Sequence, residues 1–153
     1  MDSNESTEHL RREHLEILRL AERMHDALSL ASMDEFAARH KGLGDLRALH
    51  HGLLGISQHC GSEDGVLESE YHHHLSGEKY DLINAQHQGI SRNLKGFIRE
   101  LPLLTADSVV DVVPGGFDLV DQIREHIEYE EELLDYIENN VSWSQNKATV
   151  ASR

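Results

Sequence analysis

Residues 123–133 read Ile123-Arg-Glu-His126-Ile-Glu-Tyr-Glu130-Glu-Glu-Leu133. Leu119 and Ile137 extend the apolar positions of this stretch at alternating steps of four and three residues, and His126 and Glu130 occupy the remaining positions of the series. A stripe with this spacing predicts the buried face of a helix in a bundle. Burying an imidazole and a carboxylate there costs on the order of several kcal/mol unless a partner satisfies them. The stretch therefore predicts a polar site inside an apolar core.

Length and charge restrict the class of protein. The chain has 153 residues, enough for one domain with one sizeable core. It has 28 acidic against 14 basic residues, which argues against binding to nucleic acid or to an anionic membrane surface. Cys60 is the single cysteine, so no internal disulfide can form. With no signal-peptide pattern and no apolar run of about 20 residues, we expect a cytoplasmic protein.

Three earlier segments repeat the stripe, and each places one histidine on it. We expect helices over about residues 7–28, 45–70, 76–100 and 117–139. The stripes of the first three contain Leu10, His14, Ile17, Ala21, Met24 and Leu28; then Leu46, Leu49, Leu53, Ile56, His59 and Glu63; then Tyr80, Ile83, His87, Ile90, Leu94, Phe97 and Leu101. No segment alternates with the period of a strand. The predicted fold class is all-α, an up-down-up-down four-helix bundle.

The remaining segments complete the predicted organisation. Residues 1–6 are expected to form an N-terminal arm, residues 7–139 the bundle, and residues 140–153 a C-terminal tail from which Trp143 can dock on the bundle. A short helical turn is expected before Gly42 and Gly44, which break or bend it. The loop over residues 102–118 is expected to include a helical turn near residues 108–113.

The second predicted helix is unusually rich in glycine. Each glycine costs a helix about 1 kcal/mol relative to alanine. Two of them bracket Glu63, which suggests a close approach of a neighbouring helix at that point. The four glycines are Gly52, Gly55, Gly61 and Gly65.

Six polar residues share the inward faces of the four helices. They are His14, His59, Glu63, His87, His126 and Glu130. In an antiparallel bundle they can meet at one height. Neutral imidazoles with carboxylates suit first-row metals such as iron, manganese or zinc, and two carboxylates able to bridge favour two metals over one. A single inward histidine is as often a hydrogen-bonded core residue, but four at matching positions favour the metal site.

These residues also carry a resemblance to a known family. The chain resembles the hemerythrin-like, His-His-Glu cation-binding domains over residues 7–139. The motifs that carry it are Arg12-Glu-His14-Leu-Glu-Ile17, His59-Cys-Gly-Ser-Glu63-Asp-Gly-Val-Leu67, Asn84-Ala-Gln-His87 and Glu125-His126-Ile-Glu-Tyr-Glu130-Glu-Glu. The resemblance implies a hemerythrin-like bundle with two iron ions joined by an oxo or hydroxo bridge. It also implies His14 and His59 on one iron, His87 and His126 on the other, and both glutamates bridging.

One position departs from the oxygen-carrying members of that family. They have a further histidine four residues before the one matched by His87, where this chain has Ile83. The set of four histidines and two glutamates is more similar to the iron–sulfur-cluster repair di-iron proteins. Fewer histidines leave open positions on the metal. We therefore expect binding of or reaction with dioxygen, peroxide or nitric oxide, including a role as an oxygen or iron sensor.

Two other classes of function remain as alternatives. One is an iron storage or donation module without turnover, and the other is a metal-free helical interaction domain. The protein partner and the choice between enzyme and sensor are left open.

Several residues allow two interpretations. Glu131 is the rival of Glu130, because the oxygen carriers place their acid one residue later, but the stripe favours Glu130. Cys60 is expected to be a buried apolar residue, with a thiol near the metal as the alternative. Tyr80 is expected to pack in the core, with a hydrogen bond to a bound ligand as the alternative. The histidines off the stripes are expected to face solvent, and the run at 72–74 has a second metal patch as its alternative; they are His9, His25, His40, His50, His51, His72, His73 and His74.

Overall fold

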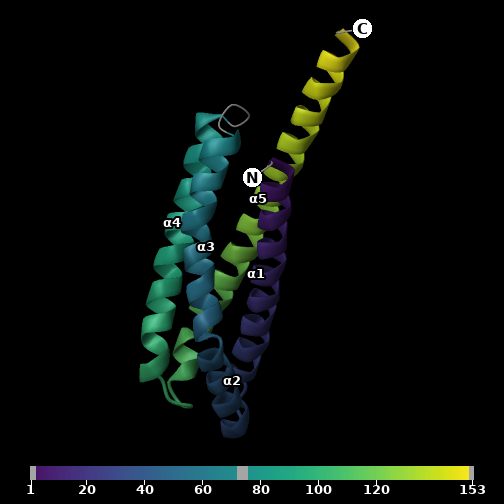
Figure 1. Ribbon diagram of the computed structural model, residues 1–153. Helices are drawn as coiled ribbons and strands as arrows, with labels where there is room; N and C mark the ends of the chain where they lie inside the picture. The colour runs from purple at the N-terminus through teal and green to yellow at the C-terminus, as the bar shows by residue number, and fades with distance from the viewer. Residues whose placement is uncertain (1–2, 72–75, 152–153) are drawn as a thin grey trace.

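The computed structural model describes residues 3–71 and 76–151, and their side chains over residues 7–60 and 76–139. Within these ranges the chain is all-helical and has no strand. Its elements are α1 (Ser3–Ala31), α2 (Phe36–Ala48), α3 (His50–Tyr71), α4 (Gly77–Glu100), two 3₁₀ turns η2 (Leu101–Leu103) and η3 (Val109–Val112), and α5 (Val113–Ala151). The long helices α1, α3, α4 and α5 lie side by side, and α2 lies at one end (Figure 1). The all-α prediction is confirmed.

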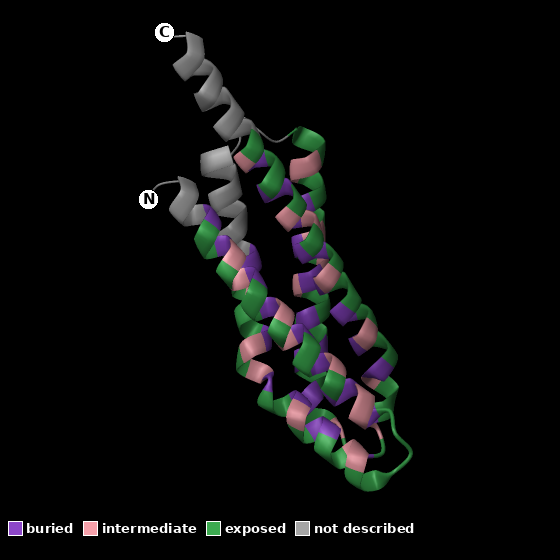
Figure 2. Ribbon diagram, turned by 90° about the vertical axis from the view of Figure 1, so that its right-hand side faces the viewer, coloured by how far each residue is buried: buried purple, intermediate pink, exposed green. Residues whose placement is uncertain are grey.

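Over the described side chains, the predicted stripes are the buried faces of the long helices, with Tyr80 partly buried (Figure 2). Most of their apolar residues form one large cluster that includes Met24, Leu53, Leu94 and Ile123. A smaller cluster lies beyond it and contains Leu10, Ile83, Leu133, Leu134 and Ile137. Between the two clusters lie three buried polar residues: His14 on α1, His87 on α4 and Glu130 on α5. The core is therefore apolar above and below a polar layer.

The break between α2 and α3 differs from the prediction. Helix α2 runs straight through Gly42 and Gly44, and the chain is interrupted at Leu49 instead. A Cβ atom on Gly42 would lie 2.6 Å from the backbone nitrogen of Ala31 and 2.7 Å from the carbonyl oxygen of Ala27. Gly42 thus allows α2 to pack directly on the backbone of α1, so it serves close packing rather than a turn.

Helix α5 is longer than predicted at both ends. It begins at Val113, so Pro114 lies in its first turn, where a proline costs no hydrogen bond. Gly116 lies against α1 and α4: a Cβ atom there would be 2.7 Å from Leu28 and 3.3 Å from Phe97. The helix continues to Ala151 through the segment expected to be a tail, and the side chain of Trp143 lies outside the described residues.

Other predicted boundaries agree with the structure. The Ser76 side chain accepts a hydrogen bond from the backbone nitrogen of Lys79 at 3.3 Å and caps α4. Pro102 follows the end of α4, and η3 is the predicted helical turn.

Helix α1 begins at Ser3, earlier than expected. Among the described residues, no helix is long and apolar enough to cross a membrane.

Candidate metal site

Glu130 lies at the centre of the polar layer with 2% of its surface exposed. Its Oε1 atom is 2.6 Å from Nε2 of His87 and 2.5 Å from Nε2 of His126. Its Oε2 atom is 3.0 Å from Nε2 of His14. One carboxylate oxygen therefore faces α4 and the preceding turn of α5, and the other faces α1.

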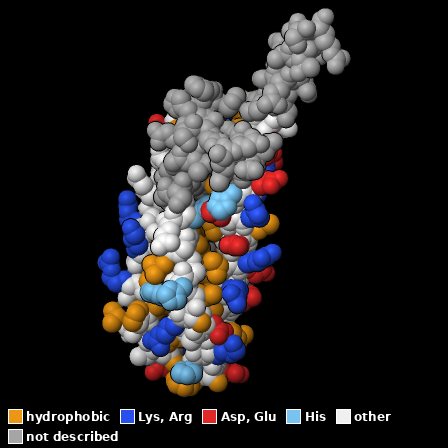
Figure 3. Space-filling model, in the orientation of Figure 1, with side chains coloured by type: hydrophobic (Ala, Val, Ile, Leu, Met, Phe, Trp, Pro, Cys, Tyr) orange, Lys and Arg blue, Asp and Glu red, His pale blue; other side chains and the backbone are white. Residues whose placement is uncertain are grey.

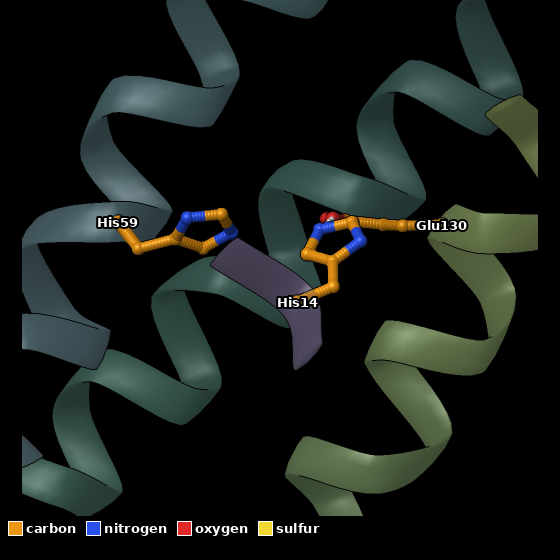
Figure 4. A group of neighbouring side chains, drawn as sticks. All are labelled: His14, His59 and Glu130. Carbon is orange, nitrogen blue, oxygen red and sulfur yellow. Dashed lines mark ion pairs between the residues drawn. The ribbon is translucent and has the colours of Figure 1, made fainter. Parts of the chain in front are cut away.

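The histidines form two pairs around this carboxylate. His14 and His59 have ring centroids 5.2 Å apart, and His87 and His126 have centroids 4.5 Å apart, both edge to face. Figure 4 shows His59 on α3 directed toward His14, with Glu130 on the far side of the His14 ring. Within each pair, one nitrogen from each ring and one oxygen of Glu130 all lie within 4.8 Å of one another. Among the residues whose side chains are described, Glu130 is the one that belongs to both groups of possible ligands.

The outward nitrogens of three of these rings are held by side chains from neighbouring helices. Glu131 Oε1 accepts a hydrogen bond from His14 Nδ1 at 2.8 Å, and Gln86 Oε1 accepts one from His126 Nδ1 at 2.6 Å. Glu13 accepts a short one from His59 Nδ1. Such contacts fix the orientation of an imidazole and direct its other nitrogen inward, as around metal-bound histidines.

Glu131 is itself anchored by Arg11 of α1. The Arg11 guanidinium forms an ion pair with Glu131 and donates hydrogen bonds to Asp135 at 2.8 Å and Glu138 at 3.0 Å. Burial lowers the pKa of Arg11, but the hydrogen bonds to Asp135 and Glu138 and the charge of Glu131 outweigh it and raise the pKa above its usual value. This cation therefore holds the outer ends of α1 and α5 together beside the polar layer.

The donor atoms fit a metal ion. A neutral imidazole that donates from Nδ1 has only a lone pair at Nε2. In His14 and His126 that lone pair faces an oxygen of Glu130, which also has only lone pairs when it is ionised. Oε2 of Glu130 is buried and accepts no hydrogen bond from the described residues. Lone pairs this close repel each other unless a bound cation neutralises them, and imidazole with carboxylate suits first-row transition metals.

The structure brings five of the six predicted ligands together. They are His14, His59, His87, His126 and Glu130. The sixth, Glu63, is on α3, but its side chain lies outside the described residues, as does the run at residues 72–74. Of the two rival glutamates, Glu130 points inward and Glu131 takes the outer nitrogen of His14.

The residues that allowed two interpretations are also placed. Cys60 is buried with 4% of its surface exposed, and Tyr80 packs against the smaller apolar cluster. Among the described residues, the histidines off the stripes are not buried; these are His9, His25, His40, His50 and His51.

Sequence reasoning missed the residues that position the rings. Glu13 and Gln86 each come one residue before a stripe histidine, yet each holds a ring on a different helix. Arg11 occupies a flank that looks like ordinary solvated surface. The only hint in the sequence is a polar residue capable of hydrogen bonding beside each candidate ligand.

Comparison with known proteins adds no further assignment: no family model, curated protein or solved structure matches this chain. The resemblance to hemerythrin-like domains therefore rests on the motifs alone. What the site can do has to be inferred from its geometry.

Proposed function

We propose that this chain is a non-haem di-iron protein with a hemerythrin-like, up-down-up-down four-helix architecture, and that its centre binds or reacts with dioxygen, peroxide or nitric oxide. The architecture is supported by α1, α3, α4 and α5 lying side by side with alternating chain direction, α2 being an addition between the first two (Figure 1). The metal centre is supported by one observation above all: the two oxygens of Glu130 face two different histidine pairs.

That arrangement favours two metal ions over one. His14 and His59 form one potential ligand group, and His87 and His126 form the other, with Glu130 common to both. A carboxylate that offers one oxygen to each group can bridge two cations. Glu63, which lies one turn after His59, is proposed as the second bridging carboxylate.

The residues of the proposed centre have two roles, metal binding and positioning of the rings. The four rings and Glu130 provide the ligand atoms, while Glu13, Gln86 and Glu131 hold the rings in place. The apolar clusters above and below the layer shield it from solvent in those two directions. Bound iron would supply redox and Lewis-acid chemistry toward small oxidants.

Small ligands have a route to this layer. A hollow of about 200 Å³ between α4 and α5 reaches His126 and is lined by Gln86, Gly89, Ile90, Gln122 and Glu125. Its size admits a diatomic molecule or peroxide. This access favours ligand binding or redox chemistry over a closed storage site.

Metal analysis and an absorption spectrum test the proposal. Protein made with iron available is expected to hold about two iron ions per chain, with a spectrum that changes on reduction. Glu130→Ala and Glu63→Ala are each expected to lose metal, whereas Glu132→Ala, which removes an exposed carboxylate from the same helix as Glu130, is the control and should retain it. Protein produced with iron and other transition metals available, yet isolated without any bound, would favour the metal-free helical interaction domain.

A further inference from the structure

A second hollow opens between α1 and α3 and leads to the other histidine pair. It has a volume of about 390 Å³, and Glu13, Glu16, Gly55 and His59 line it together with Gly52, Gln58 and three apolar side chains. The side chain of His59 is 6% exposed and closes its inner end, whereas Glu16 and Gly55 are exposed. The hollow therefore connects solvent to a candidate ligand of the buried centre.

Gly55 lines this hollow and makes no close packing contact with a neighbouring helix. A Cβ atom on Gly52, one turn earlier, would lie 2.7 Å from the Leu20 side chain, so Gly52 permits a close approach of α1. A Cβ atom on Gly55 would meet nothing within 4 Å. The glycine still costs α3 about 1 kcal/mol of helix propensity. The lack of a side chain at Gly55 leaves the surface of the hollow that leads to His59 uncovered.

The charges around the hollow favour a cation. Glu13 Oε1 is 2.7 Å from Nε2 of the exposed His9, and the other oxygen of Glu13 holds His59. Glu16 forms no ion pair with any described residue, so its charge is available at the rim. Figure 3 shows acidic and histidine side chains exposed on this face, alongside lysine and arginine side chains.

The hollow between α3 and α4 has the opposite character. It also reaches a ring of the polar layer, His87, but Arg92 and Lys95 line it. The smaller hollow beside His126 contains one carboxylate, from Glu125, and two side-chain amides. Of the three, the hollow between α1 and α3 presents the most negative rim to an incoming metal ion.

We propose that the hollow between α1 and α3 is the route by which the metal cation enters the centre. The ion is attracted by Glu16 and Glu13, passes the open surface of Gly55, and reaches His59 and then His14. No covalent or redox step is involved, because the ion only exchanges water for protein ligands. This proposal rests on the proposed metal centre and adds how that centre is filled.

The test is the rate at which apo-protein takes up Co²⁺, followed by visible absorption in a stopped-flow instrument. Gly55→Leu extends a side chain over the hollow and is expected to slow uptake about tenfold or more while final occupancy stays the same. Gly55→Ala gains the same kind of helix stabilisation but leaves most of the hollow open, so its rate should stay near wild type. Gly89→Leu fills the hollow between α4 and α5 instead. Its Cβ position is equally open, so the variant should fold, and it should take up Co²⁺ at the wild-type rate because the proposed route is unchanged.

A charge variant provides an independent test if Gly55→Leu fails to fold. Glu16→Gln is expected to slow uptake about threefold at low ionic strength, with the difference vanishing in high salt. An unchanged low-salt rate in Glu16→Gln, equal rates for Gly55→Leu and wild type, or slowing in Gly89→Leu alone would each overturn the route. Wild-type protein that takes up no Co²⁺ at all would instead overturn the metal centre, so the two failures are distinguishable.

Discussion

His14 lies between two consecutive glutamates of α5, with Glu131 on its Nδ1 atom at 2.8 Å and Glu130 on its Nε2 atom at 3.0 Å. Neighbouring residues of a helix point in directions about 100° apart, so they rarely act on the same side chain. Here they do because α1 lies beside α5 with the imidazole ring edge-on between them. The inner glutamate can share a metal ion with His14, while the outer one orients the ring.

Substituting the two glutamates separately is expected to give unequal losses of metal. Glu130→Ala removes the residue that, among the described residues, is common to both candidate ligand groups, and should abolish occupancy of both sites. Glu131→Ala leaves all ligand atoms present but frees the His14 ring, and should weaken metal affinity about 10–100-fold. Metal stoichiometry after dialysis and competition with a chelator measure both effects. The reverse order would mean that Glu131, not Glu130, is the ligand.

Removing the metal is expected to destabilise the protein. Without it, the buried rings and Glu130 lose the cation that balances their lone pairs. A chelated sample should melt about 5–10 °C below the metal-bound protein, which corresponds to tight binding to the native state alone. His126→Ala should melt like the chelated sample and respond little to added iron. Superimposable melting curves of apo and metal-bound wild type would contradict this prediction.

Two glycines of α2 should respond to alanine in opposite directions. Gly42→Ala places a methyl group 2.6 Å from the backbone of Ala31 and is expected to cost about 1–3 kcal/mol of unfolding free energy. Gly44→Ala has nothing within 4 Å and should stabilise by about 0.5–1 kcal/mol through helix propensity alone. Urea denaturation of the apo-protein measures both, without interference from metal. A neutral Gly42→Ala would mean that α2 does not pack closely on α1.

The residue at position 83 is expected to control the fate of bound oxygen. Ile83 is 1% exposed and belongs to the smaller apolar cluster, one turn before His87. Because it provides no ligand, we expect the reduced iron protein to be oxidised by dioxygen without forming a reversible oxygen complex. Spectra recorded on mixing with dioxygen and again after degassing test this. Recovery of the reduced form on degassing would make the protein an oxygen carrier.

Substitution at the same position provides a companion measurement. Ile83→His adds a fifth imidazole beside the layer and should shift the protein toward reversible oxygen binding, while Ile83→Leu, which conserves volume, should behave as wild type. In the absence of metal the new histidine is expected to cost about 1–3 kcal/mol, since it buries a polar ring among leucines and isoleucines. Identical oxygen behaviour of both variants would show that position 83 is too far from the centre to act.

The spacing of apolar residues was sufficient to predict the long helices and their buried faces, because burying one face of a helix requires apolar residues about every 3.6 positions. His14, His87 and Glu130 could be placed inward for the same reason: they interrupt an otherwise apolar series. The break at Leu49 could not be predicted. A glycine such as Gly42 is equally compatible with a turn and with close helix packing, so the sequence placed the break at the wrong residue. The roles of Glu13 and Gln86 were equally hidden. Each acts on a ring from another helix, and that contact depends on the relative rotation and height of two helices.

Arg11 connects the candidate metal site to the surface of the protein. Its guanidinium links Asp135, Glu138 and Glu131, and through Glu131 it reaches the ring of His14. Asp135 and Glu138 are largely exposed, with side chains 66% and 42% accessible. Substitutions at the surface can thus alter the orientation of a core imidazole while every candidate ligand stays in place. Substitution of exposed residues such as Asp135 and Glu138 would thus be a way to change the metal affinity of such a site without changing any residue of its interior.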